Sequence, residues 1–386
     1  MSRALYASVA LLLLATSAHA QTFDSGSDGS DGPLFLTTPG IVDFNPAVLF
    51  PHHVGNVYRF QAITIGRGVT VRLNTLAGGS AAAWLSQGPV LIEGTLDLTG
   101  ADSVAYAAGG KRTPVRGGPG GYPGGVGASK YAEAQPGEGT SPGAPNHGGA
   151  FSGNIFLVPL TGGSGGGGTD AASGGGGGGA LLIASSSSIT VNGIINANGG
   201  NQNAAEFATT GGGGGAVRLA APRIDGTGGT ITARGGKASG GDFSGSDGRI
   251  RIEAFENELT ADLNGTPVSV GKPFRPFPPD EAGPSARILS MGGVSVADSP
   301  EGSHVPPISA PGPVKIEIEG RRMKPGMVVR LRVYSETGPD QSVLVPMSPE
   351  TDLSRGIAEI QAPSANAVLV VSVELKEQPR AFTARH

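Results

Sequence analysis

The side chains that could carry acid–base chemistry are few, and they lie far apart in the sequence. Hydrolysis or elimination at a sugar chain needs two carboxylates, or an aspartate with a lysine or arginine, on one face of the protein. The candidates are Glu93, Asp97, Asp225 and Arg234. Asp97 and Asp225 fall in different halves of their strand pairs, so stacking of repeats is not expected to align them. Trp84 is the only tryptophan, and we expect no catalytic residues.

The histidines do not form a catalytic or metal-binding set. His52 and His53 are adjacent, and neighbouring residues of a strand point to opposite faces, so a shared metal ion is not expected. A position on the surface of a cap is the favoured interpretation. The other histidines of the mature chain lie in a Gly/Pro-rich loop, in a Pro-rich segment and at the C-terminus, at His147, His304 and His386.

An Asp/Gly/Ser-rich segment over 21–32 offers the one candidate metal site. Asp24, Asp28 and Asp31 alternate with glycine, and such a segment can wrap Ca²⁺ with oxygen ligands. It lacks the distal bidentate glutamate of a 12-residue Ca²⁺ loop. A flexible lead over 21–32 is therefore favoured, with Ca²⁺ over 24–32 as the alternative. No other metal or cofactor is expected.

Basic residues are sparse. The formal net charge is -4, and no basic stripe is present to neutralise phosphates, which excludes a nucleic-acid partner. A small cationic patch could contact a carbohydrate or an acidic polymer, although a solvated loop is the favoured interpretation. The patch comprises Lys111, Arg112 and Arg116 with Tyr122 and Tyr131 nearby. Cell-envelope or matrix polysaccharide is the partner class that the sequence allows.

The N-terminus predicts export from the cytoplasm. Residues 1–20 have the basic start, apolar centre and small-residue cleavage site of a signal peptide, so the mature chain is expected to begin at Gln21. No later stretch approaches the ~20 apolar residues of a transmembrane helix. The sequence contains no cysteine, which excludes disulfides and thiol metal sites. We expect a secreted, extracellular or cell-surface protein.

A repeated pattern organises the middle of the chain. Three segments, VLIEGTLDLTG (90–100), ITVNGIINANG (189–199) and IDGTGGTITARG (224–235), each read as strand, glycine bend, strand and closing glycine. Ala180 and Ala216 are 36 positions apart, and Ala216 and Arg249 are 33 apart. A near-fixed period of short strands predicts stacked coils of parallel strands. The expected inward residues are Leu182, Ile189, Val191, Ile194, Val217, Leu219, Ile224, Ile231, Ile250 and Ile252.

The chain contains 67 glycines, many of them in runs that begin near 162, 174 and 211. Ordering glycine costs more backbone entropy than ordering any other residue. The runs are therefore either mobile loops, extended three-fold helices that bond side by side, or corners where coils pass closely. The excursion over 101–160 is expected to be a disordered or loosely packed surface arm.

The predicted fold is all-β: a Gly-rich parallel β-solenoid or β-helix followed by a small C-terminal antiparallel β-sandwich. After the signal peptide and the lead we expect an aromatic cap with a core of its own and first strands (33–88), then the solenoid (89–297). A Pro-rich linker (298–313) and five alternating strands of the sandwich (314–378) follow.

The ordered series SDGSDGPL, ITIGRGVTVRL, GGGGGGALLI, GGGGGAVRLAA, GRIRIEA and PGPVKIEIEG resembles a group of secreted bacterial glycine-rich repeat proteins. The resemblance covers nearly the whole mature chain and brings no catalytic residues. The coils also resemble the pectin-lyase-like β-helix superfamily, which includes polysaccharide lyases, hydrolases and adhesins. That likeness concerns fold alone.

Together these observations favour a non-catalytic secreted or cell-surface scaffold with an adhesin-like role. An extracellular polysaccharide lyase or hydrolase of the β-helix type is the alternative. Ice binding would require ladders of T-x-T rungs, and Thr230 with Thr232 supplies a single rung. The sequence does not determine the oligomeric state.

Overall fold

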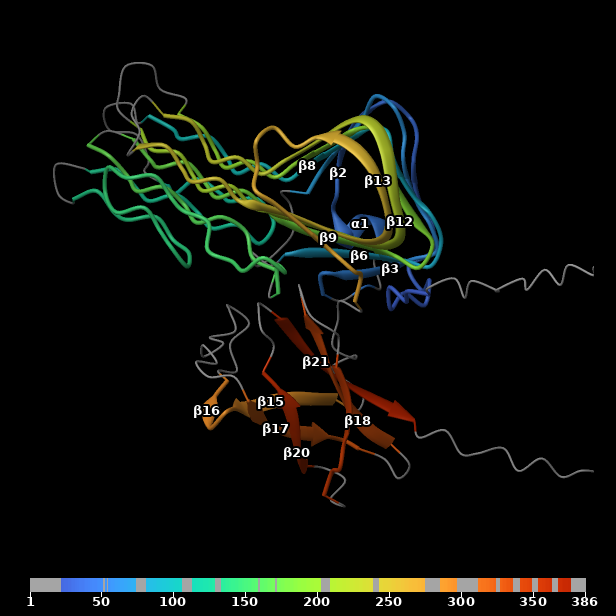
Figure 1. Ribbon diagram of the computed structural model, residues 1–386. Helices are drawn as coiled ribbons and strands as arrows, with labels where there is room; N and C mark the ends of the chain where they lie inside the picture. Colours follow the sequence, from blue (N-terminus) through green and yellow to red (C-terminus); the bar gives the residue numbers. More distant parts are fainter. Residues whose placement is uncertain are drawn as a thin grey trace, which may run out of the picture.

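The structure is a computed structural model, and its described part is all-β apart from one four-residue helix (Figure 1). The residues it describes are 22–50, 53, 55–73, 81–105, 113–128, 133–158, 160–170, 172–202, 209–238, 243–274, 285–296, 312–323, 327–335, 341–348, 353–362 and 367–375. The predicted signal peptide and most of the predicted linker lie outside this part. Among the described residues, no helix has the length and apolar character needed to cross a membrane.

One large sheet of parallel strands curls around a shared interior. Its strands are β1 (Leu34–Leu36), β2 (Gly40–Asp43), β3 (Val57–Phe60), β4 (Ile63–Ile65), β5 (Val69–Arg72), β6 (Ala82–Ser86), β7 (Val90–Ile92), β8 (Thr95–Asp97), β9 (Ala180–Ser185), β10 (Ser188–Val191), β11 (Ile194–Asn196), β12 (Ala216–Thr232), β13 (Arg249–Asp262) and β14 (Val268–Gly271). The helix α1 (Pro46–Leu49) follows β2. Parallel neighbours require a long return path between strands, which successive passes of the chain provide.

The register of the sheet stacks the sequence repeats on one another. Ala216 pairs with Ala180 on one side and with Arg249 on the other, so the predicted spacings of the repeats coincide with paired positions. The strand–bend–strand segments also align, because β10 pairs with both β7 and β12, and β11 pairs with both β8 and β12. Successive passes therefore place corresponding positions of the repeats in register.

The inner faces of these strands form one apolar cluster. Four aromatic residues, Phe44, Tyr58, Phe60 and Trp84, are fully buried in it, with ring centroids 5.1 Å apart for Phe44 and Trp84. The sequence predicts a cap with a core of its own, but these rings belong to the same cluster as the aliphatic residues of later passes. The aromatic residues join this cluster because Phe44 and Phe50, which flank α1, both contact it.

Eight of the ten predicted inward residues belong to this inner cluster, and Leu182 and Ile194 do not. Ile194 is 43% exposed, whereas its neighbour Ile195 is fully buried. Val191, Ile195 and Ala197 are all buried, so the alternation continues unbroken through the turn and Ile194 falls on the outer face. Leu182 is buried on the outer face, in a smaller cluster with Leu85 and other residues.

The glycine tracts 162–168, 174–179 and 211–215 lie side by side and bond through their backbones. Amide groups in the first tract turn to three neighbouring segments in succession, and the same neighbour returns every third residue. The donor–acceptor pairs are Gly163–Gly178 and Gly166–Gly175, Ser164–Ala150 and Gly167–His147, and Gly165–Glu138 and Gly168–Gln135. A period of three residues is that of an extended polyproline-II helix.

Close approach explains why these positions carry glycine. A Cβ atom on Gly177 would overlap the carbonyl group of Gly163, and one on Gly165 would overlap that of Pro123. The obstacle is backbone in both cases, so no side-chain rotation relieves it. Among the extended segments described here, the absence of side chains is what allows the carbonyl and amide groups to meet.

The excursion over 101–160 differs from the predicted loose arm. Its described residues join the glycine tracts: Gly118 donates to the Gly177 carbonyl at 2.9 Å, and Gly125 donates to the Gly166 carbonyl at 2.8 Å. Glycine and proline dominate these segments, so they can adopt the same extended form and enter the same lattice. We call the three tracts with segments 113–128 and 133–150 the glycine bundle; in Figure 1 these segments run together away from the sheet.

The C-terminal part contains two small antiparallel sheets that share one apolar cluster. One contains β15 (Ser285–Met291), β16 (Val294–Ser295), β17 (Pro313–Arg321) and β20 (Leu353–Gln361), and the other contains β18 (Met327–Ser335), β19 (Gln341–Val345) and β21 (Ala367–Leu375). The sequence predicts that the solenoid extends to residue 297, but β15 and β16 belong to the C-terminal sheets. β15 pairs antiparallel with β17 and places Ile288 against Ile318, so apolar cross-strand contact draws it into the later unit.

Candidate functional site

The structure keeps the predicted acidic candidates apart. Asp97 of β8 pairs with Arg72 and Asn196 in one column of the outer surface. Asp225 of β12 pairs with Thr190 and lies in the column of β10. These are different strand columns, as the sequence predicts, and no direct contact joins the two carboxylates among the described residues.

Each of these carboxylates accepts hydrogen bonds close to its own strand. Asp97 Oδ1 accepts from the Thr99 hydroxyl at 2.6 Å and from the Thr99 amide at 3.1 Å. Asp225 Oδ1 accepts from the Thr190 hydroxyl at 2.6 Å, and Oδ2 accepts from Arg223 Nε at 2.9 Å. The Thr190 hydroxyl, followed by Arg223, holds the pKa of Asp225 below its usual value. The Thr190–Asp225 bond joins two neighbouring passes, whereas Asp97 bonds within its own pass.

The other two candidates, Glu93 and Arg234, also hold the fold together. Glu93 accepts from Arg67 Nε at 3.2 Å across two stacked turns. Arg234 Nε donates to Asp247 at 3.1 Å, and its Nη1 donates to the Asn264 carbonyl at 2.7 Å. None of the four predicted residues therefore meets another of them.

The Asp/Gly/Ser-rich lead is bonded to the sheet. The Ser25 hydroxyl donates to the Ser86 carbonyl at 2.8 Å, and the Ser27 hydroxyl donates to the Phe60 carbonyl at 2.7 Å. The Ser30 hydroxyl, followed by the Ser30 amide, which donates to Asp28 Oδ1 at 3.0 Å, holds the pKa of Asp28 below its usual value. The lead therefore differs from the predicted flexible segment, because its serine side chains bond it to successive passes.

The lead's three aspartates face separate partners. Asp24 accepts from the amide two residues on, at 2.8 Å, and Asp28 does the same within its own turn. Asp31 accepts from the Arg59 amide at 2.6 Å and contacts His53 Nδ1 at 2.9 Å. No group of three histidine, aspartate or glutamate side chains gathers as metal ligands within the described residues. A Ca²⁺ site over 24–32 stays a prediction.

The side chain of His53 is largely buried, which corrects its predicted place on a cap surface. Its ring stacks on Tyr58 with centroids 4.4 Å apart, and its side chain is 8% exposed. Burial, followed by the Asp31 charge, raises the pKa of Tyr58 to about 12. Asp31 explains the burial, because it supplies a hydrogen-bond partner that a buried imidazole needs. His52 lies outside the described residues.

Only part of the predicted cationic patch is described. Arg116 is exposed and Tyr122 is half-buried, and the backbone of Tyr122 bonds to the glycine tracts. His147 is exposed in its predicted loop. Lys111, Arg112, Tyr131, His304 and His386 lie outside the described residues. Arg116 is the member of the patch that a binding experiment can address.

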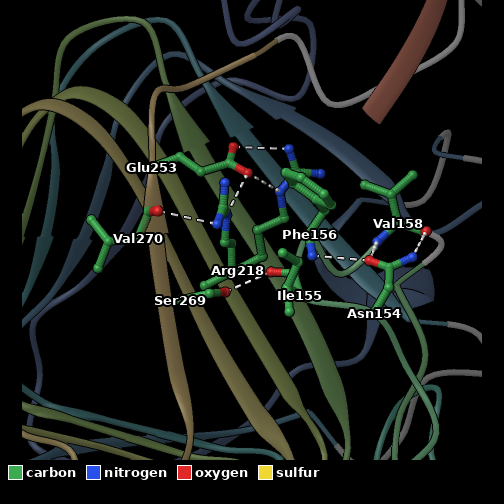
Figure 2. A network of polar contacts seen from close by, with 9 residues as sticks. Asn154, Ile155, Phe156, Val158, Arg218, Glu253, Ser269 and Val270 are labelled. Atoms are coloured by element: carbon green, nitrogen blue, oxygen red, sulfur yellow. Dashed lines mark hydrogen bonds and ion pairs between the residues drawn. The ribbon is translucent and has the colours of Figure 1, made fainter. Parts of the chain in front are cut away.

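Sequence reasoning missed a buried cluster of Arg218, Glu253 and Arg251 on the outer face of β12 and β13 (Figure 2). Arg218 Nη2 donates to Glu253 Oε2 at 2.9 Å, and Arg251 Nε donates to Glu253 Oε1 at 3.2 Å. The rings of Phe274 and Phe156 lie 4.3 and 4.9 Å from the Arg218 and Arg251 guanidinium carbons. Aromatic faces thus help to stabilise two cations that share one carboxylate.

The segment 154–158 covers this cluster. The Phe156 amide donates to Asn154 Oδ1 at 2.9 Å, and the Ser269 hydroxyl donates to the Ile155 carbonyl at 2.5 Å (Figure 2). The cluster therefore fastens the end of the excursion to the large sheet. Stacking at a repeat of 33 residues predicts that Arg218 and Arg251 are neighbours. It gives no sign of burial, since the covering segments are distant in sequence.

Comparison with known proteins adds no relationship: no family model, no curated protein and no solved structure matches the chain. The resemblance to secreted glycine-rich repeat proteins is therefore a prediction from sequence, and any function must be argued from the geometry above.

Proposed function

We propose that this chain is a non-catalytic secreted or cell-surface scaffold, built as a rigid β-solenoid with a glycine bundle and a small C-terminal β-sandwich. Signal-like residues at 1–20 support export. In this proposal the protein presents extended surfaces to cell-envelope or matrix polysaccharide. The proposed role depends on a rigid fold and on its exposed surface, and it requires no reacting group.

The observation that carries the proposal is the three-residue bonding pattern of the glycine bundle. Ordering so many glycines has a large entropic cost, and the backbone bonds offset it only when every segment keeps its place. The tracts continue directly into strands, since Gly179 precedes β9 and Gly215 precedes β12. Such a rigid arm suits a spacer or an adhesive surface better than a mobile linker would.

The charged outer residues support the same interpretation, because many of them are tied to one another. Arg223 alone contacts Asp225, Glu256 and Glu258 across two passes. The outer face of β5, β8 and β11 places Arg72, Asp97 and Asn196 in register at the regular spacing of stacked strands. A repeating polar surface offers hydrogen bonds to a repeating polymer.

Two measurements test the proposal. Fractionation of a culture that makes the protein should place it in the envelope or matrix, or in the medium. The purified chain from Gln21 onward should then bind members of a panel of acidic and neutral polysaccharides, with and without Ca²⁺, and release no new reducing ends or unsaturated products. Turnover that disappears in Asp97→Asn or Asp225→Asn would replace the scaffold with the lyase or hydrolase alternative.

A pair of arginine variants locates the contact. Arg116→Gln should weaken binding to acidic polysaccharides because it removes an exposed cation of the patch. Arg223→Gln is the matched control, since its guanidinium is held by three carboxylates. Equal loss in both variants would indicate a general charge effect and argue against contact through the excursion.

A further inference from the structure

The first pass of the chain leaves two strand edges without a strand partner in the described residues. β1 pairs with β4 alone and β2 with β5 alone, so they are the two ends of the strand path. Leu34 and Gly40 direct their amides toward β4 and β5, donating to Ala62 and Gly68. Alternate residues of a strand direct these groups to the opposite side. Phe35 and Ile41 therefore present theirs at the open edge.

Exposed apolar side chains accompany these open edges. Phe35 is 60% exposed and Ile41 is 61% exposed, and Val48 of α1 is more exposed still. An open, apolar strand edge is a template for pairing with another chain. The third strand at this end, β3, is different, because residues of the lead run along it: Asp31 donates to Arg59 and Gln61 donates to Gly32.

At the opposite end of the sheet, the strand columns that begin with β1 and β2 carry charge instead. The second half of β13 exposes Glu256, Glu258 and Asp262. Charged side chains on an edge oppose pairing with another strand. A head-to-tail stack would place Phe35 and Ile41 against this acidic edge, so the two ends do not complement each other.

We propose that two copies of the chain join head to head, with β1 of each copy pairing antiparallel with β2 of the other. The chain bends between β1 and β2, and a two-fold axis through residues 37–39 exchanges the two edges. Phe35 then lies opposite Ile41 of the second copy, and Ile41 lies opposite its Phe35. This register joins residues whose backbone groups are both open, and it forms the same aromatic–aliphatic contact twice.

The alternatives complement the edges less well. Moving the register by two residues places Asp43 opposite Phe35, which sets a carboxylate against a ring. A single extended peptide could pair with β1 or with β2 but not with both, because of the bend between Leu36 and Gly40. A second copy satisfies both edges at once, and this association is independent of what the scaffold binds.

Sedimentation of the chain from Gln21 onward tests the association. At about 100 µM, where contacts with micromolar Kd are occupied, we expect a dimer. Ile41→Lys should give a monomer, because it sets a charge against Phe35 on both sides. Val270→Lys is the matched control: Val270 is 52% exposed on β14, at the other end of the sheet, and this variant should stay dimeric. A monomeric parent chain, or a dimer broken only by Val270→Lys, would overturn the proposal.

Cross-linking tests the register. The sequence contains no cysteine, so only the introduced cysteines can form a disulfide. Facing residues of an antiparallel pair have Cα atoms about 4.5–5.5 Å apart, within the range that a disulfide spans. Oxidising a mixture of Phe35→Cys and Ile41→Cys chains should give covalent dimers, whereas neither chain alone should. Cross-linking of Phe35→Cys alone would indicate β1–β1 pairing instead. A dimer that gives no cross-link in the mixture would place the interface elsewhere, and either result contradicts the proposed pairing.

Discussion

The large sheet and the glycine bundle are built by the same passes of the chain, yet different forces hold them together. In the sheet, residues such as Ile189 and Ile224 stack in register and bury their side chains completely. In the bundle, the tract 174–179 has no side chains at all and contacts its neighbours through amides and carbonyls. One region is stabilised by buried apolar area and the other by backbone hydrogen bonds.

This difference implies that the bundle depends on the sheet. Burying a large apolar side chain contributes roughly 1.5–3 kcal/mol, whereas a backbone hydrogen bond contributes about 0.5–1.5 kcal/mol net. Glycine must also overcome its greater loss of backbone entropy. The junctions show how the sheet helps: Ala216 donates to the Gly179 carbonyl, and Arg249 donates to the Gly215 carbonyl. The strands fix the register in which each tract leaves the sheet.

The largest expected effect comes from charging the sheet's interior. Ile195→Asp places an unpaired carboxylate in the core, and we expect it to cost more than about 4 kcal/mol and to unfold the sheet. Limited proteolysis and circular dichroism measure this directly. Because the bundle depends on the sheet, its segments should become cleavable in the same variant.

Ile194→Asp is the matched control, because it changes the same residue type one position away. Ile194 is 43% exposed, so the carboxylate would be hydrated and the protein should stay folded. If both variants unfolded, the inward assignment of Ile195 would lose its support. A protease-resistant bundle in unfolded Ile195→Asp protein would show that the bundle is stable by itself.

The second prediction concerns the point where the two regions are fastened. Glu253→Ala leaves Arg218 and Arg251 buried without their carboxylate, and we expect a loss of about 3–5 kcal/mol. Denaturant unfolding measures it. Glu258→Ala removes an exposed carboxylate from Arg223 and should cost less than about 1 kcal/mol. Similar losses in the two variants would mean that burial does not give the cluster its strength.

The third prediction tests the bundle by itself. Gly177→Ala sets a methyl group against the Gly163 carbonyl, and we expect a loss of about 1–3 kcal/mol. Amide exchange should accelerate in the tracts and stay slow in β10 and β11. In Gly153→Ala the nearest obstacle is the Phe151 ring, which can rotate, so exchange there should change little. Equal acceleration throughout the sheet would contradict separate stabilisation of the two regions.

Sequence reasoning succeeded where a side-chain pattern sets the structure. The alternation of apolar residues and the 36- and 33-residue spacings predict the stacking of Ala180, Ala216 and Arg249. It failed at Ile194, because the alternation of buried residues continues through the turn at Asn192 and Gly193 and makes Ile195 the inward residue. The phase of a short strand after a turn depends on turn geometry, which composition does not specify.

The glycine bundle and the buried cluster could not be predicted in the same way. Glycine tracts have no side-chain period, so the sequence leaves mobile loops and bonded helices equally open. The burial of Arg218 and Arg251 depends on Phe274 and Phe156, which reach them from distant parts of the chain. His53 likewise is buried because Asp31 of the lead lies beside it. When segments distant in sequence cover a polar residue, the residues around it carry no pattern that predicts its burial.

The smallest expected effect is a difference between the two regions in how their stability depends on pH. The Thr190 hydroxyl, followed by Arg223, lowers the pKa of Asp225, so the folded pKa lies below the unfolded value of about 3.9. The resulting stability is present above that unfolded value and is lost as the pH falls through the folded pKa. Asp225 is 27% exposed, so solvent screening should keep the contribution below about 1 kcal/mol. Thr190→Val should therefore reduce the loss of stability between about pH 5 and pH 3, measured by denaturant unfolding.

Thr227→Val is the control, since Thr227 is exposed on the same strand and its amide bonds to Asn192 rather than to Asp225. The tracts 162–168, 174–179 and 211–215 contain no ionisable side chain, so mild acid has no group to titrate within them. Amide exchange at about pH 4 should then accelerate first in β10 and β12, near Asp225, and only later in the tracts. Identical acid dependence in the parent chain and Thr190→Val, or earlier exchange in the tracts, would show that this charged tie does not contribute to the sheet's stability.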